Sequence, residues 1–150
     1  MTVAAQDLMK LYSERILALA AGISRTGRLE QPDGTASKRS PLCGSTVTVD
    51  VAVTDGRISD YAQDVKACAL GQSSAAVLAD AVIGRDRGEI QAGRDALYAM
   101  LKTGGEAPDG PFAALEALTP ARDYKNRHAS ILLAWDATLA ALDAAETAKG

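Results

Sequence analysis

Residues 45–66 read STVTVDVAVTDGRISDYAQDVK, and this stretch decides the fold. In its first half, valines alternate with smaller or polar residues, which is the two-residue period of a half-buried strand. Asp55-Gly56 follows directly, and this dipeptide favours a tight hairpin turn. The second half, Arg57 to Lys66, alternates less regularly but can pair back antiparallel. The stretch therefore predicts a β-hairpin whose second strand has the less defined register.

Helical spacing of apolar residues dominates the chain on both sides of this hairpin. Before the hairpin, Gln6 to Ala21 has the pattern of an amphipathic helix, and Gly22 to Ser40 that of a loop with room for one short strand. After it, the predicted helices are Gly71 to Val82, Arg87 to Leu101, a short helix from Pro111, and Asn126 to Glu146. This order predicts an α+β fold, in which a small antiparallel sheet of about three strands packs against several helices, with a long C-terminal helix.

Length and composition bound what the chain can be. A chain of 150 residues, 47% of them apolar, fits one compact domain over residues 1–150. Aromatic residues make up only 4%, and Lys and Arg are scattered through a chain of net charge -3, so no nucleic-acid surface is expected. No apolar run reaches the roughly 18 residues that span a bilayer, and residues 1–6 lack a signal-peptide pattern. We expect a soluble, cytoplasmic protein that does not bind membranes.

The two cysteines are the first candidates for chemistry, because thiols stay reduced in the cytosol. Cys43 precedes the first strand of the hairpin, and Cys68 lies where the second strand ends and a helix begins. Antiparallel pairing puts these two strand ends at the same edge, so the cysteines should lie close together. The positive end of the helix dipole favours the thiolate of Cys68, the form that binds metals and accepts sulfur. Taken alone, Cys43 fits a loop cysteine with no role about equally well, and without the pairing Cys68 fits a buried structural cysteine better.

His128 is the only histidine, near the start of the last predicted helix. It shares the inward stripe of that helix with Leu132 and Trp135, four and seven positions further on. An isolated histidine on an apolar face is usually a core residue. The helical pattern alone therefore does not make it a ligand, and the short motif around it carries more information.

Several motifs along the chain match one known pattern. Residues 41–45, Pro-Leu-Cys-Gly-Ser, correspond to a Pro-x-Cys-Gly-Asp loop, and Cys68 precedes a helix with Ser73-Ser74-Ala75-Ala76. Residues 128–132 read HASIL where the pattern is His-Cys-Ser-Ile-Leu, and the opening segment with Leu11-Tyr12 and residues 27–30 (GRLE) is also similar. In this combination the chain resembles, over almost its whole length, the iron-sulfur cluster assembly scaffold family of the IscU, SufU and NifU N-terminal type.

The chain departs from that family at the ligands. Ser45 stands in place of the aspartate, and the third cysteine is replaced by Ala129, or by Ser130 if the register is counted back from Ala134-Trp135. The Pro-Pro-Val-Lys chaperone motif is also missing. The resemblance then implies a reduced ligand set, which consists of Cys43, Cys68 and His128. Such a set suits a zinc or iron ion, or a labile [2Fe-2S] cluster.

Three functions are compatible with these residues. The first is a scaffold-like protein that holds a metal ion or cluster. The second is a sulfur relay, in which Cys43 or Cys68 accepts persulfide sulfur from a cysteine desulfurase. The third is a non-catalytic interaction module that keeps the fold without the chemistry. None of them turns over an organic substrate, so we expect no enzyme activity, and the expected partners are a cysteine desulfurase and other iron-sulfur assembly proteins.

Overall fold

The hairpin predicted from residues 45–66 is present in the computed structural model, which describes residues 12–41 and 44–149. β2 (Thr46–Thr54) pairs antiparallel with β3 (Arg57–Lys66), and the last pair of the register joins Thr54 to Arg57. Asp55 and Gly56 form the turn with φ of 53° and 76°. Two successive left-handed residues match the twist of antiparallel strands, which is why Asp-Gly is favoured here.

A third strand completes the sheet at its edge. β1 (Gly34–Arg39) pairs antiparallel with β2, which gives the strand order β1-β2-β3. This strand occupies the second part of the segment predicted as a loop with room for one short strand. A small antiparallel sheet of three strands packed against helices confirms the predicted α+β fold class.

The irregular alternation of β3 has a structural cause. Tyr61, Ala62 and Gln63 are all buried, although consecutive residues of a strand point to opposite faces. The segment before β1 pairs with the free edge of β3, where the Gln63 amide donates to the Arg25 carbonyl at 2.9 Å and the Gly27 amide donates to the Gln63 carbonyl at 2.9 Å. The same segment reaches the second face through Arg28, which bonds to Asp50, the register partner of Ala62. Both faces of β3 are therefore shielded from water at this point.

The buried carboxylate of Asp50 in β2 holds the same segment against the sheet. Arg28 donates to it through Nε at 2.6 Å and Nη2 at 3.1 Å. The Leu29 amide and the Thr35 hydroxyl donate to it as well, at 3.0 and 2.5 Å. Burial alone would raise the pKa of Asp50, but these hydrogen bonds and the charge of Arg28 outweigh it and hold that pKa below its usual value.

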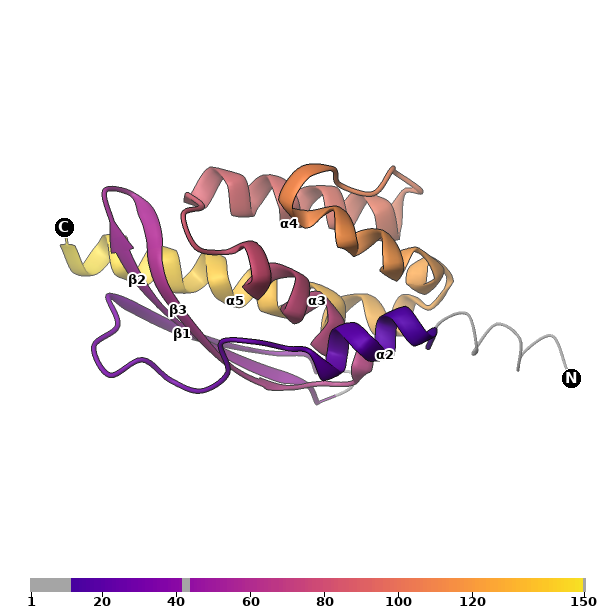
Figure 1. The fold of residues 1–150 in the computed structure, drawn as a ribbon, viewed down its shortest axis with the longest axis horizontal. Coiled ribbons are helices and arrows are strands. Elements are labelled where there is room, and N and C mark those ends of the chain that lie inside the picture. The colour runs from indigo at the N-terminus through magenta and orange to yellow at the C-terminus, as the bar shows by residue number, and fades with distance from the viewer. Residues whose placement is uncertain (1–11, 42–43, 150) are drawn as a thin grey trace, which may run out of the picture.

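Helices cover the sheet (Figure 1). Their bounds are α2 (Glu14–Ala21), α3 (Ala69–Ala81), α4 (Arg87–Lys102), the 3₁₀ segment η1 (Gly110–Asp123) and α5 (Lys125–Lys149). The described part of the helix predicted from Gln6 is α2, which Ser13 caps by accepting from the Ile16 amide, and residues 6–11 lie outside the described chain. The predicted long C-terminal helix is α5, which contacts β1 and β2 on one side and α3 and α4 on the other.

The core forms where α5 crosses between the sheet and the other helices. Trp135 of α5 is fully buried and meets Phe112 edge-to-face, with ring centroids 4.8 Å apart. Gly93 of α4 makes room for this pair, since a Cβ there would lie 2.8 Å from the Trp135 ring. Within the described chain, no helix is both long enough and apolar enough to cross a membrane.

Candidate functional site

Cys68, Ser45 and Ser130 meet at the open end of the hairpin. Cys68 is the N-cap residue of α3, two positions after β3 ends, and its side chain is partly exposed. Ser45 directly precedes β2, and Ser130 lies in the first turns of α5. The Ser130 hydroxyl oxygen lies 3.7 Å from the Cys68 sulfur and 3.1 Å from the Ser45 hydroxyl oxygen. One thiol and two hydroxyls from three elements therefore share a small polar cluster, which we call the Cys68 cluster.

The loop between β1 and β2 brings Ser45 to this cluster. The Ser40 amide donates to the Ser45 carbonyl at 2.8 Å, and the Gly44 amide donates to the Ser40 carbonyl at 2.9 Å. Gly44 has a φ of +67°, a left-handed conformation that glycine adopts without strain. Cys43 belongs to this loop in sequence but lies outside the described residues. The described residues on either side of residues 42–43 are Pro41 and Gly44, and both are exposed.

A close approach of α5 to α3 brings Ser130 to Cys68. Gly71 in the first turn of α3 permits this approach, because a Cβ there would lie 2.7 Å from the Ser130 hydroxyl oxygen and 2.8 Å from the Ala67 Cβ. Further along α3, the Ser74 hydroxyl donates to the Ile131 carbonyl at 2.7 Å and accepts from the Trp135 indole at 3.0 Å. These buried hydrogen bonds fix the rotation of α5 and hence the direction of the Ser130 side chain.

The two residues that the sequence left open for the third position, Ala129 and Ser130, lie in different surroundings. Ser130 is 1% exposed and contacts Cys68, whereas Ala129, one residue earlier on α5, is exposed. Adjacent residues of an α-helix point about 100° apart, so only one of the two can face α3. The residue that faces Cys68 is Ser130, as counting back from Ala134-Trp135 suggests.

His128 lies on a different side of α5 from Ser130. The predicted inward stripe is present, since His128, Leu132 and Trp135 are all buried. The His128 Nε2 atom, however, is 2.8 Å from the Ala121 carbonyl oxygen in η1, and no contact with Cys68 is found for it in the described chain. Residues two positions apart on an α-helix point about 200° apart, which explains why Ser130 and His128 contact different elements.

The environment of His128 keeps its imidazole neutral. Burial lowers the pKa of His128 below its ordinary value, the Ala121 carbonyl partly offsets this, and the nearby charge of Lys102 lowers the pKa further. The second ring nitrogen, Nδ1, is buried and has no hydrogen-bond partner among residues 12–41 and 44–149. A neutral imidazole with one nitrogen available is the form that binds metals.

The chemistry of the Cys68 cluster is that of one soft sulfur donor beside two neutral oxygen donors. Thiolates suit zinc and iron, whereas serine hydroxyls are weak ligands. In the described part of the chain, no group of three or more His, Cys, Asp and Glu side chains gathers in a way that could hold a metal ion. A metal at this cluster therefore needs a further thiolate, and Cys43 is the other cysteine of the chain.

Comparison with known protein families and sequences gives one consistent result. Residues 11–131 match the family described as the NifU-like N-terminal domain. Among curated proteins, the chain is 25% identical over 125 residues to the iron-sulfur cluster assembly scaffold protein IscU of Thermotoga maritima, covering 83% of this chain and 87% of that protein. It is 26% identical over 98 residues to the scaffold protein IscU of Streptococcus pyogenes serotype M1, covering 65% and 62% of the two chains.

Solved structures show the same fold. The N-terminal part of a nitrogen-fixing NifU-like protein from Brucella abortus superimposes with a TM-score of 0.91 at 48% identity, covering 94% of this chain and 98% of that one. The SUF-system protein FiSufU of Fervidobacterium islandicum AW-1 superimposes with a TM-score of 0.80 at 22% identity, covering 89% and 98%. At 22% identity the second likeness shows the fold alone.

Proposed function

This chain belongs to the family of NifU-like N-terminal domains, and from that premise we propose that it is an iron-sulfur cluster assembly scaffold-like protein. Its cargo is a zinc or iron ion, or a labile [2Fe-2S] cluster, held by Cys43 and Cys68. The observation that supports this proposal most strongly is the Cys68 cluster. Ser45, two residues after Cys43, is linked to Cys68 through Ser130, so the loop that carries Cys43 reaches the thiol of Cys68.

The donor set favours cargo that leaves easily. A [2Fe-2S] cluster normally takes four protein ligands, and a structural zinc ion also takes four. Two thiolates and the neutral serine hydroxyls beside them bring less negative charge to a bound ion or cluster than four thiolates would. The remaining coordination positions of the metal are then open to water, to sulfide or to a side chain of a partner protein. Weak retention suits a protein that passes its cargo on.

The third ligand has two candidates. The sequence resemblance implies His128, which would have to coordinate through Nδ1, the nitrogen that has no partner in the described chain. Ser130 is the second candidate, because its hydroxyl already lies 3.7 Å from the Cys68 sulfur. The contacts of the described residues favour Ser130 for this position and a packing role against η1 for His128.

Anaerobic reconstitution tests the proposal. The purified chain is incubated with ferric iron and sulfide, which supply the two Fe(III) and two sulfide ions of an oxidised cluster, and is then desalted and examined by visible absorption and by iron and sulfide analysis. We expect an absorbing species with two iron and two sulfide ions that Cys68→Ser and Cys43→Ser each abolish and that a chelator removes. Ala129→Ser, which adds a hydroxyl at an exposed position beside the cluster, is the matched control and should reconstitute like the wild type. A species that survives both cysteine variants would contradict the assignment.

A sulfur relay is the second candidate function, and the partial exposure of Cys68 favours it. In that reaction the Cys68 thiolate attacks the outer sulfur of a persulfide on a cysteine desulfurase. A new sulfur-sulfur bond forms on Cys68, and the desulfurase cysteine leaves as a thiolate. Loading the chain from a desulfurase and then adding a thiol reductant should release one sulfide per chain. If no sulfide is released, the relay is excluded while the scaffold proposal is untouched, because reconstitution uses free sulfide.

A further inference from the structure

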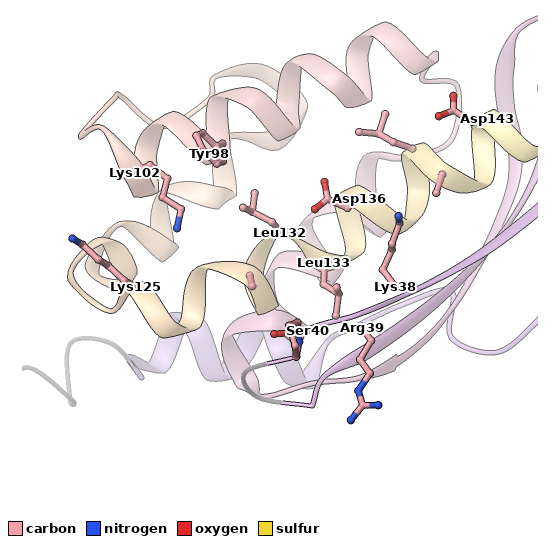
Figure 2. Close-up of a pocket in the computed structure, with 14 residues that line it drawn as sticks. Lys38, Arg39, Ser40, Tyr98, Lys102, Lys125, Leu132, Leu133, Asp136 and Asp143 are labelled. Carbon is pink, nitrogen blue, oxygen red and sulfur yellow. The ribbon is translucent and has the colours of Figure 1, made fainter.

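A groove of about 670 Å³ runs along α5 between α4 and the end of β1 (Figure 2). α5 forms its floor, α4 forms one wall, and the end of β1 with the residues that follow forms the other wall. The lining residues are Lys38, Arg39, Ser40, Pro41, Tyr98, Lys102, Lys125, Ala129, Leu132, Leu133, Asp136, Leu139, Ala140 and Asp143. The groove borders the candidate site, since Ser40 bonds to Ser45 and Ala129 precedes Ser130.

The charges that line the groove do not cancel. The two acidic residues are neutralised by α4, because Asp136 accepts from Arg94 at 3.0 Å and Asp143 accepts from Arg87 at 2.7 Å. The four basic residues of the groove form no ion pair with any described residue. They are Lys38, Arg39, Lys102 and Lys125. The groove therefore presents an excess of positive charge, although the whole chain has a net charge of -3.

The floor between these charges is apolar. Three leucines of α5 line it, each with 5–8% of its surface exposed, namely Leu132, Leu133 and Leu139. Tyr98 on the α4 wall is 41% exposed. Lining residues of α5 run from Lys125 to Asp143, which corresponds to about 27 Å of helix at a rise of ~1.5 Å per residue. A groove of this length, with an apolar floor and basic ends, fits an extended chain of about eight residues better than a small anion.

We propose that this groove docks a segment of a partner protein in which acidic residues alternate with aliphatic ones. The aliphatic side chains would cover the α5 floor, and the carboxylates would meet Lys38, Arg39, Lys102 and Lys125. A nucleic acid is a poorer fit, because the floor is aliphatic, a single exposed aromatic side chain lines it and two carboxylates remain in it. A segment bound here lies beside Ser40 and Pro41, so docking places a partner next to the candidate cargo site.

A fluorescent ten-residue peptide of alternating leucine and glutamate serves as the probe for the full-length chain. The control peptides alternate leucine with lysine, and serine with glutamate. The protein variants are Lys38→Glu and Lys125→Glu in the groove, with Lys66→Glu as the matched control at an exposed position outside it. Ala140→Glu places a charge on the apolar floor. Anisotropy at about 0.15 M salt gives the dissociation constants, and amide chemical shifts map the binding position.

We expect the leucine-glutamate peptide to bind at least tenfold tighter than either control peptide, with shifted amides on α5 between residues 129 and 140. Each groove lysine variant should weaken binding about fivefold, a typical effect of a rim charge. Ala140→Glu should weaken it at least as much, and Lys66→Glu should change it less than twofold.

Three results would overturn the proposal. The first is equal affinity for the serine-glutamate and the leucine-glutamate peptides, which would show that the groove recognises negative charge alone. The second is a set of shifted amides away from α5. The third is concentration-dependent self-association that Lys38→Glu removes, which would make a second copy of the chain the occupant. No metal is needed in this measurement, so its outcome is independent of the proposed cargo.

Discussion

The sulfur of Cys68 lies 3.7 Å from the hydroxyl oxygen of Ser130, across the contact between the start of α3 and the first turns of α5. This relationship joins two residues far apart in the sequence. It depends on Gly71, which leaves no side chain between the helices, and on the buried hydrogen bonds of Ser74. A change at Ser130 therefore acts directly on whatever Cys68 binds.

Replacing Ser130 by cysteine should strengthen metal binding. The new thiol would face Cys68 from the same direction as the hydroxyl, and a thiolate binds zinc and iron more strongly than a serine does. We expect the affinity for zinc, measured by competition with a chelating dye, to rise at least tenfold. Ala129→Cys is the matched control, because that exposed position faces away from α3, and it should leave the affinity unchanged. Equal gains in both variants would show that the register is wrong.

Gly71→Ala should separate α3 from α5. Its Cβ would lie 2.7 Å from the Ser130 hydroxyl oxygen, so one helix must shift. Overpacking of this kind outweighs the better helix propensity of alanine, and we expect a loss of about 1–2 kcal/mol in the free energy of unfolding. In a Ser130→Ala background the loss should shrink, because the clashing oxygen is absent. Urea unfolding of the four chains measures this, and equal losses in both backgrounds would refute the contact.

Ser74→Ala should destabilise the core. The Ser74 hydroxyl accepts from the Trp135 indole and donates to the Ile131 carbonyl, and the variant leaves a buried N–H without a partner. Such a group costs about 2 kcal/mol. Fluorescence of Trp135, the only tryptophan, reports the unfolding. Ser37→Ala, which removes an exposed hydrogen bond to Thr48, is the control, with an expected loss below about 0.5 kcal/mol.

Asp50→Asn should change both the stability and its pH dependence. The hydrogen bonds from Arg28, Thr35 and the Leu29 amide hold the pKa of Asp50 below its usual value, even though burial opposes this. A carboxyl with a lowered pKa in the folded state stabilises above its ordinary pKa of ~3.9 and loses that contribution as the pH falls through the folded value. The variant should lose about 2 kcal/mol at neutral pH. Below about pH 4 the wild-type advantage should shrink, and a constant difference down to pH 2 would contradict this.

Local patterns were sufficient to predict the elements of the fold. The Asp55-Gly56 turn and the valine alternation of β2 depend on neighbouring residues only, and both are confirmed. The burial of three consecutive residues in β3 is not a local property. It arises because Arg28, in the segment before β1, bonds to Asp50 beside Ala62 on the outer face, and no spacing within β3 encodes that contact.

For the candidate site, too, the sequence predicted one part and missed another. The meeting of the two hairpin ends follows from antiparallel pairing, so the position of Cys68 near Ser45 could be anticipated. The direction of residues on α5 could not, since the rotation of a helix depends on its packing partners. For that reason the motif around His128 left Ala129 and Ser130 as alternatives. The basic groove was missed because its four cations come from three parts of the chain, where they look scattered.

The metal content of the chain as purified without a chelator tests the central claim most directly. Elemental analysis of the wild type, Cys68→Ser and Cys43→Ser compares equal amounts of folded protein. The proposed site predicts bound zinc or iron at a fixed stoichiometry in the wild type and its loss in both variants. Zinc or iron retained in full by either variant, or a wild type that takes up neither metal when they are supplied, would contradict a thiolate site at the end of the hairpin.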